Sequence, residues 1–193
     1  IKAFVAALAG GMSAHEASYE AGFARKDSRP QIRRTDIEKY PPVSVRFSMF
    51  GALELTRSCP NRCAFCQTPN LFGPVRHRSK ETIISACQTM LAKKMSDIRF
   101  ITPNALGHPD WRGLLEALNA MRREGARVFF GSFPSEVHPQ FLTQENLCFL
   151  KEHCDNRRLV VGLQSGSERT LKRIRRHHTV CLLYTSDAAD DGE

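Results

Sequence analysis

The sequence has no long hydrophobic run and no regular pattern of paired cysteines. No apolar stretch approaches the ~20 residues of a membrane-spanning helix, and the apolar opening at residues 1–9 is too short to span. The cysteines number seven, which is odd, and Cys87, Cys148 and Cys154 fall in helix-like segments. These features exclude a membrane-spanning protein and a disulfide framework, and they predict a reduced, cytoplasmic protein.

The charge is strongly one-sided but is not concentrated. The net charge is +8, yet the basic residues are dispersed apart from the run at 172–176. Dispersed charge is typical of a solvated surface, so contact with RNA stays open but is not favoured. His77, His177 and His178 are interpreted as surface residues and not as ligands. With 193 residues, of which 41% are hydrophobic, one domain with a sizeable core is expected.

The first fifty residues contain a helix signal followed by a connector. Ser13 and Glu16 have the spacing of a capping box, which predicts a helix over residues 14–25. Residues 28–50 have no regular pattern, and the prolines after Tyr40 favour extended backbone. Residues 1–50 are therefore expected to be a helical connector from an upstream domain that would precede Ile1.

From residue 52 onward, strand and helix patterns alternate. Strands are expected at residues 52–56, 98–101, 127–130 and 159–163. Helices are expected to begin at Ser79, Asp110, Thr143 and Ser167. Such alternation predicts an α/β fold of βα units on a parallel sheet, although the pattern does not separate an open sheet from a barrel. In either case the working residues should lie just past the carboxyl ends of the strands.

A cluster of cysteines follows the first expected strand. Cys59, Cys63 and Cys66 are spaced as Cys-x3-Cys-x2-Cys. Thiolates are soft ligands for zinc, Cu(I) or an iron–sulfur cluster, and three are one short of the four that usually hold a four-iron cluster. The alternative is a structural zinc site with Cys87 or His77 as the fourth ligand. Zinc ribbons use two separated ligand pairs, and this chain has no second pair.

The cysteine loop resembles that of radical S-adenosylmethionine (radical SAM) enzymes, because Phe65 precedes the last cysteine and a strand precedes the loop. The resemblance implies a [4Fe–4S] cluster on the three cysteines, with SAM at the fourth iron and Phe65 beside it. The cluster would cleave SAM reductively to a 5′-deoxyadenosyl radical, using electrons from an external donor of the flavodoxin or ferredoxin type. It also implies a partial (β/α) barrel, here truncated to about four βα units.

The resemblance places SAM contacts at the other strand ends. Asn104 follows the second strand, where related enzymes often carry a Gly-Gly-Glu-like stretch that this chain lacks. Ser132 follows the third strand. Gln164 and Ser165, within Gly-Leu-Gln-Ser-Gly-Ser, resemble the ribose motif after the fourth strand, and Arg176 matches by spacing an arginine that meets the SAM carboxylate.

Longer matches favour one branch of the family. The segments 53–60, 66–69 and 76–79 resemble radical SAM proteins with an upstream cobalamin-binding domain. Cobalamin would then be bound by a domain outside this chain, and the substrate would be a small molecule or unknown. One alternative is a radical SAM methylthiotransferase acting on tRNA or a ribosomal protein. It would need a second cysteine set before the barrel, and residues 1–50 contain no cysteine. The other alternative is a non-enzymatic zinc-binding module.

The chain is expected to divide into three parts. Residues 1–50 form the connector, and residues 51–180 form a radical SAM core that is incomplete at its carboxyl end. Residues 181–193 resemble the translated sequence of an adapter used in DNA library preparation, and are expected to be a non-native tail. We therefore expect an enzyme fragment with little activity by itself.

Overall fold

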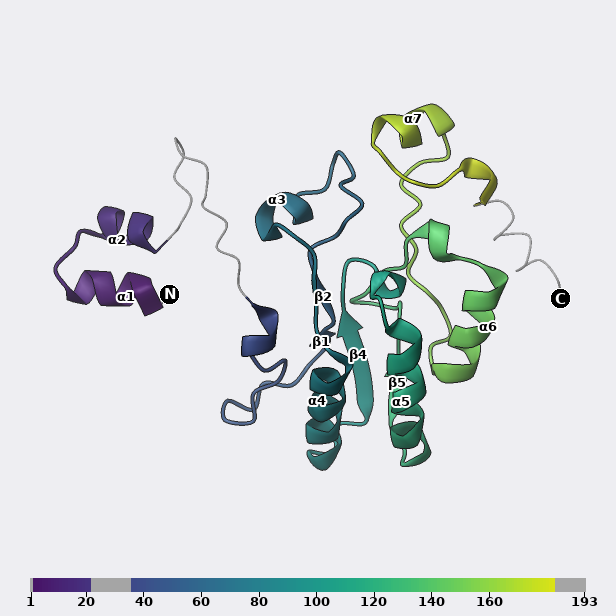
Figure 1. Ribbon diagram of the computed structural model, residues 1–193, viewed down its shortest axis with the longest axis horizontal. Helices are drawn as coiled ribbons and strands as arrows, with labels where there is room; N and C mark the ends of the chain where they lie inside the picture. The colour runs from purple at the N-terminus through teal and green to yellow at the C-terminus, as the bar shows by residue number, and fades with distance from the viewer. Residues whose placement is uncertain (1, 22–35, 183–193) are drawn as a thin grey trace.

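The computed structural model describes residues 2–21 and 36–182 (Figure 1). Its centre is a parallel sheet with strand order β1-β4-β5, formed by Leu53–Glu54, Asp97–Ile101 and Arg127–Phe129. The strands alternate with helices, so the expected α/β fold with a parallel sheet is confirmed. The arrow of β4 points toward the end of the molecule where α3 (Thr68–Phe72) and α7 (Glu168–Arg173) lie (Figure 1).

The helices begin where local side-chain signals place them. In α4 (Lys80–Ala92) the Ser79 hydroxyl accepts a hydrogen bond from the Thr82 N–H. Thr143 caps α6 (Gln144–His153) in the same way, and Ser167 caps α7. Each hydroxyl satisfies one of the amide donors that a helix start leaves open. Asp110 stands at the N-cap position of α5 (Trp111–Arg123), but its side chain makes no capping bond.

The core lies between the sheet and the helices α4 and α5. Buried side chains recur at helical spacing along both helices, as Ile83 and Cys87 do in α4, and meet strand residues such as Phe100. The rings of Phe100 and Phe130 meet edge to face, 5.4 Å apart. Full burial of one such side chain contributes about 1.5–3 kcal/mol, so this layer holds the strand ends in place.

The first expected strand divides into two. Residues Leu53–Glu54 stay in the parallel sheet as β1, whereas Thr56–Arg57 leave it as β2 and pair antiparallel with β3 (Arg76–His77). Leu55 joins both sheets, because its N–H donates to Ile101 and its carbonyl accepts from the Arg78 N–H. The chain that leaves the parallel sheet in this way carries the cysteine loop.

The prediction of a fourth strand at residues 159–163 is wrong. Within residues 159–163 the structure forms only an isolated parallel bridge between Val137 and Val161. Val160 donates its N–H to Gly131 at 2.9 Å and accepts one from Val137 at 2.8 Å. The position beside the end of β5 is thus shared with the loop at Val137, which leaves residues 159–163 no continuous strand to pair with.

The remaining elements are short. The helices α1 (Lys2–Ala9) and α2 (Ala14–Glu20) pack on each other, and Ser13 and Glu16 form the expected capping box. A helix was expected over residues 14–25; α2 covers residues 14–20 of it, and residues 22–25 lie outside the described part of the chain. The described residues also form three 3₁₀ helices: η1 (Ile37–Lys39), η2 (Ala105–Gly107) and η3 (Pro139–Phe141). None of the helices described is both long and apolar enough to cross a membrane.

Candidate functional site

The cysteine loop follows β2 and is shaped by two residues with left-handed backbone. Ser58 has a φ of 74° and Arg62 a φ of 46°. The buried Ser58 hydroxyl donates to the Gly73 carbonyl at 2.6 Å, which ties the start of the loop to the end of α3. The Ala64 N–H donates to the Ile174 carbonyl at 2.9 Å, so the middle of the loop rests on the end of α7. These bonds fold the loop back toward the strand ends.

The three cysteines line one cavity of about 590 Å³. The cavity lies at the carboxyl ends of β1 and β4, where Glu54 and Thr102 contribute to its wall. Residues from the far end of the chain, among them Gln164 and Arg176, line it as well. The chain thus brings the cysteine loop and Gln164, which were expected at strand ends, together with Arg176 around one cavity.

The thiols influence one another across this cavity. Burial raises the pKa of the Cys59 thiol, the negative charges of Cys63 and Cys66 raise it further, and a hydrogen bond from Asn61 and the cation of Arg176 oppose the rise. Arg176 Nη1 lies 3.5 Å from the sulfur of Cys63, as a donor. Thiolates crowded in this way favour a positively charged occupant.

The cysteines are not arranged around a single point. Within residues 2–21 and 36–182, no group of three or more His, Cys, Asp or Glu side chains is arranged to hold a metal ion. A structural zinc needs its ligands about one tetrahedral centre, whereas the thiolates of a four-iron cluster bind different irons. Three thiol donors that line one cavity can each bind a different iron of a cluster.

Gly162 is the point where three cavity side chains meet. Arg176 Nη2 donates to the Gly162 carbonyl, and Gln164 turns back over the glycine with a φ of 68°. A Cβ atom added at Gly162 would lie 2.8 Å from Gln164 Nε2, 3.0 Å from Arg176 Nη2 and 3.4 Å from Glu136 Oε2. The missing side chain leaves the space in which these groups converge.

The other expected SAM contacts lie in different surroundings. Phe65 lines the cavity and is 51% exposed. Asn104 is buried, and its Oδ1 accepts the His138 N–H at 3.1 Å, so it holds a loop in place outside the cavity lining. Ser132 is also buried away from that lining. Ser165 accepts the Ser167 N–H at 3.1 Å, so its hydroxyl helps to form the turn into α7.

A buried histidine in the cavity wall was missed by sequence reasoning. His138 is 3% exposed, its Nδ1 accepts the Gln140 N–H, and its ring lies 5.7 Å from that of His178. Burial, with the charges of Arg176 and the neighbouring histidines, lowers the pKa of His138 to about 4. The only sequence signal was a histidine before Pro139, a pattern compatible with an N-cap. His178 is buried too, which corrects its interpretation as a surface residue.

Residues 53–183 match the family model of the radical SAM superfamily. The chain belongs to the radical SAM superfamily. Members of this superfamily use a [4Fe–4S] cluster and SAM, in agreement with the cofactors expected from the cysteine loop. Membership accounts for the cysteine spacing and for the parallel sheet that carries it.

Methylthiotransferases are among the curated relatives that match. A tRNA-2-methylthio-N(6)-dimethylallyladenosine synthase of Rhodopirellula baltica is 28% identical over 171 residues, covering 81% of this chain and 34% of the relative. The synthase of Chlorobium phaeovibrioides is 29% identical, covering 82% and 37%. A ribosomal protein uS12 methylthiotransferase, RimO, of Acetivibrio thermocellus is 24% identical, covering 68% and 30%. The chain thus spans about a third of the length of these relatives.

A solved structure shares the fold. It is the radical SAM methyltransferase TsrM from Kitasatospora setae, described with cobalamin and a [4Fe–4S] cluster bound. The TM-score is 0.56 at 16% identity, and the match covers 69% of this chain and 27% of TsrM. At this identity the likeness concerns the fold alone.

Proposed function

We propose that this chain is the core of a radical SAM enzyme in which Cys59, Cys63 and Cys66 hold a [4Fe–4S] cluster and leave one iron for SAM. The observation that carries the proposal is the position of Arg176. It lies 113 residues from Cys63 in the sequence, yet its guanidinium reaches that sulfur and the cavity. A cavity lined by three thiols and by a cation next to one of them suits a cluster and an anionic ligand group together.

Each side chain in the cavity has a role that follows from its chemistry. The Arg176 guanidinium offsets the charge of the thiolates and can bind a carboxylate through two parallel hydrogen bonds. Gln164 offers both a donor and an acceptor to sugar hydroxyls, and the half-exposed Phe65 ring can pack against a planar base. When bound, the cluster supplies one electron for the reductive cleavage of SAM to a 5′-deoxyadenosyl radical.

The fold and its boundaries belong to the same proposal. Residues 51–180 would form part of a (β/α) barrel of the radical SAM type, with the segment at 159–163 beside β5. Residues 1–50 would connect it to an upstream domain, and residues 181–193 would be a non-native tail. An electron donor of the flavodoxin or ferredoxin type would deliver the electron. Cobalamin association in the full-length protein is supported by the shared fold with TsrM only at the level of architecture.

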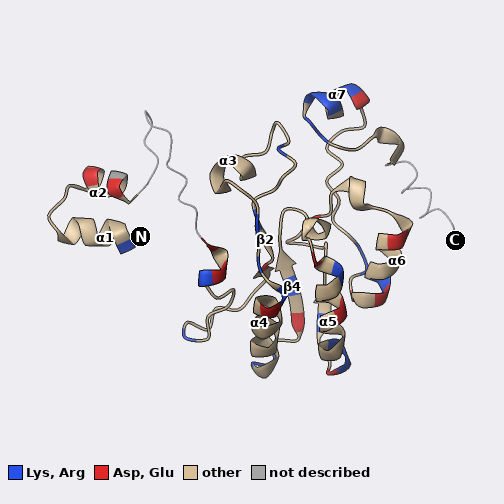
Figure 2. Ribbon diagram, in the orientation of Figure 1, with Lys and Arg blue, Asp and Glu red and all other residues tan. Residues whose placement is uncertain are grey.

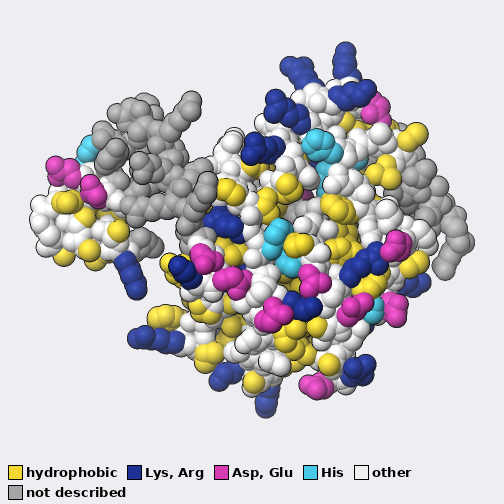
Figure 3. Space-filling model, viewed as in Figure 1, with side chains coloured by type: hydrophobic (Ala, Val, Ile, Leu, Met, Phe, Trp, Pro, Cys, Tyr) yellow, Lys and Arg dark blue, Asp and Glu magenta, His cyan; other side chains and the backbone are white. Residues whose placement is uncertain are grey.

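A methylthiotransferase is the second candidate, favoured by the names of the matching relatives. Figures 2 and 3 add an observation on the surface. Lys and Arg side chains gather on and around α7, at the same end of the molecule as the cysteine loop. Exposed cations beside a reaction cavity suit an RNA substrate. Cofactor analysis of the full-length protein distinguishes the candidates. Bound cobalamin supports the cobalamin-associated enzyme, and a second iron–sulfur cluster supports the methylthiotransferase.

Anaerobic reconstitution tests the shared part of both candidates. The chain is treated with iron and sulfide, reduced, and studied by EPR with and without SAM. We expect a cluster signal that changes when SAM is added, and its loss in Cys59→Ser, Cys63→Ser or Cys66→Ser. Cys148→Ser is the matched control, because Cys148 is exposed and lies outside the cavity lining. A chain that binds zinc but forms no cluster, or a cluster indifferent to SAM, would overturn the proposal.

A further inference from the structure

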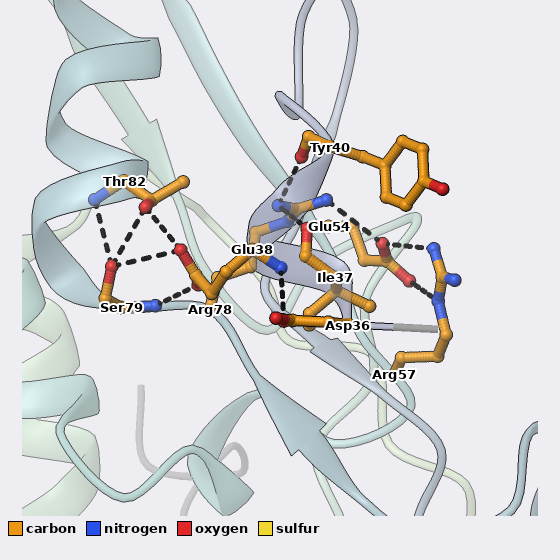
Figure 4. Close-up of polar contacts among 9 residues, drawn as sticks. All are labelled: Asp36, Ile37, Glu38, Tyr40, Glu54, Arg57, Arg78, Ser79 and Thr82. Carbon is orange, nitrogen blue, oxygen red and sulfur yellow. Dashed lines mark hydrogen bonds and ion pairs between the residues drawn. The ribbon is translucent and has the colours of Figure 1, made fainter. Parts of the chain in front are cut away.

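An arginine is buried just outside the cavity, directly after β3. Arg78 is 4% exposed, and arginine is almost never so buried unless its charge is paired. Its Nη1 donates to the Ile37 carbonyl at 2.6 Å and to the Tyr40 carbonyl at 2.7 Å. Its Nη2 lies 3.5 Å from Glu54 Oε2 (Figure 4). One guanidinium thus contacts two separate parts of the chain.

Glu54 continues this contact to the cavity. Its two oxygens accept hydrogen bonds from Arg57, Nε at 2.6 Å and Nη2 at 2.7 Å, in the bidentate geometry that is strongest for this pair. Both Glu54 and Arg57 line the cavity, and Arg57 lies two residues before Cys59. Glu54 therefore stands between a buried guanidinium and a second one at the cavity wall (Figure 4).

On its other side, Arg78 holds a segment that we call the strap, residues 36–40. The strap is also fastened by Ile37, which is 2% exposed, and by Glu38. Glu38 accepts hydrogen bonds from the Ser79 N–H and the Thr82 hydroxyl, both at 2.6 Å, at the start of α4. A carboxylate is stabilised there by the free amides of the helix start. The strap is therefore fixed at both Arg78 and α4.

We propose that Arg78 is a positioning residue that couples the strap to the cavity: by holding Glu54, it orients the Arg57 guanidinium beside the cysteine loop. This rests on the proposed function, since the cluster and SAM are the occupants that Arg57 would face. A guanidinium already held in one rotamer at the cavity wall spares an occupant the entropic cost of ordering it. Coupling of this kind is reciprocal, so an occupied cavity should also tighten the strap.

The chain without cofactor provides the first test, because it does not depend on the proposed function. Hydrogen exchange is compared between the unmodified chain, Arg78→Lys and Glu54→Gln. Lysine keeps the positive charge of Arg78 but not the planar guanidinium group with its several donors. Glutamine keeps the shape of Glu54 but not its negative charge. We expect about tenfold faster exchange of the cysteine loop in both variants, and of the strap in Arg78→Lys. A loosened strap with an unchanged cysteine loop would overturn the inference.

The reconstituted chain provides the second test. We expect Arg78→Lys and Glu54→Gln to keep the iron and sulfide content but to bind SAM about tenfold more weakly, and the double variant to be no worse than either single one. Arg123→Lys is the control, because Arg123 is exposed on α5. A lower melting temperature with unchanged SAM affinity would mean a merely structural role. If the unmodified chain forms no cluster, the proposed function fails, and the exchange result still decides the inference.

Discussion

Gly162→Ala should weaken SAM binding while leaving the fold intact. The φ of Gly162 does not fall in the left-handed region, so alanine suits the backbone. The added methyl group would meet Gln164 Nε2 at 2.8 Å and Arg176 Nη2 at 3.0 Å. Both atoms are the ends of flexible side chains, which can move aside. The substitution therefore acts on the position of two cavity groups and not on the core.

The expected loss of SAM affinity follows from the hydrogen bonds that Gln164 and Arg176 would no longer make. A hydrogen bond to a charged group contributes about 1.5–3 kcal/mol, and about 1.4 kcal/mol corresponds to a tenfold change in affinity. If Arg176 loses its contact with the SAM carboxylate, affinity should fall about 10- to 100-fold. The free energy of unfolding should change by less than about 1 kcal/mol, because Gln164 is exposed and Arg176 is only partly buried.

The assay titrates SAM into the reconstituted chain and follows the EPR signal of the reduced cluster. Gly166→Ala is a matched control in the same loop, since a methyl group there would meet nothing within 4 Å. Iron content and thermal unfolding are measured for all three proteins. A dissociation constant within threefold of the unmodified chain, or an equal loss in the control, would refute the idea that Gln164 and Arg176 hold SAM across Gly162.

Two further predictions concern stability. Gly131→Ala should lower the free energy of unfolding by roughly 3 kcal/mol, because Gly131 has a φ of +72° and an added methyl group would lie 2.6 Å from a Val137 methyl. Gly51→Ala is the control, and it should leave thermal unfolding unchanged because the space around Gly51 is open. Because the pKa of His138 is lowered to about 4 in the folded chain, its imidazole stays neutral there, whereas in the unfolded chain it takes up a proton below about pH 6.5. The free energy of unfolding should therefore fall by up to about 3 kcal/mol as the pH drops from about 6.5 to about 4. His138→Asn should flatten that dependence in urea unfolding without cofactors, and an unchanged slope would contradict the neutral buried imidazole.

Helix starts could be predicted from the sequence because their causes are local. The hydroxyls of Ser79, Thr143 and Ser167 each bond an amide three residues ahead, and no distant partner is needed. The same is true of the capping box at Ser13. Where the interaction spans three residues, residue type and spacing contain the required information.

The fourth strand could not be predicted because a strand needs a partner. The apolar run at 159–163 has the composition of a buried strand, but Val137 and Gly131 meet it at isolated points. That arrangement depends on the course of a distant loop, which no local pattern describes. The division of the first strand has a similar cause, because β3 takes Thr56–Arg57 as its partner.

The site could be predicted as a region more reliably than as a set of side chains. The strand-end rule and the family resemblance place the cysteines, Gln164 and Arg176 around one cavity. The rule does not say where a side chain points, and Asn104 and Ser132 lie in buried positions outside the cavity lining. His138 was missed because its burial arises only from tertiary packing, which no local sequence pattern describes.

The backbone around the cavity gives an independent reason to regard it as functional. Six described residues other than glycine have left-handed φ values, and three of them, Ser58, Arg62 and Gln164, line the cavity. This conformation costs a residue other than glycine roughly 1–2 kcal/mol, and such outliers persist only where the surrounding structure enforces them. At two of these positions the side chain shapes the cavity wall: Ser58 fastens the loop to α3, and Gln164 places an amide over Gly162.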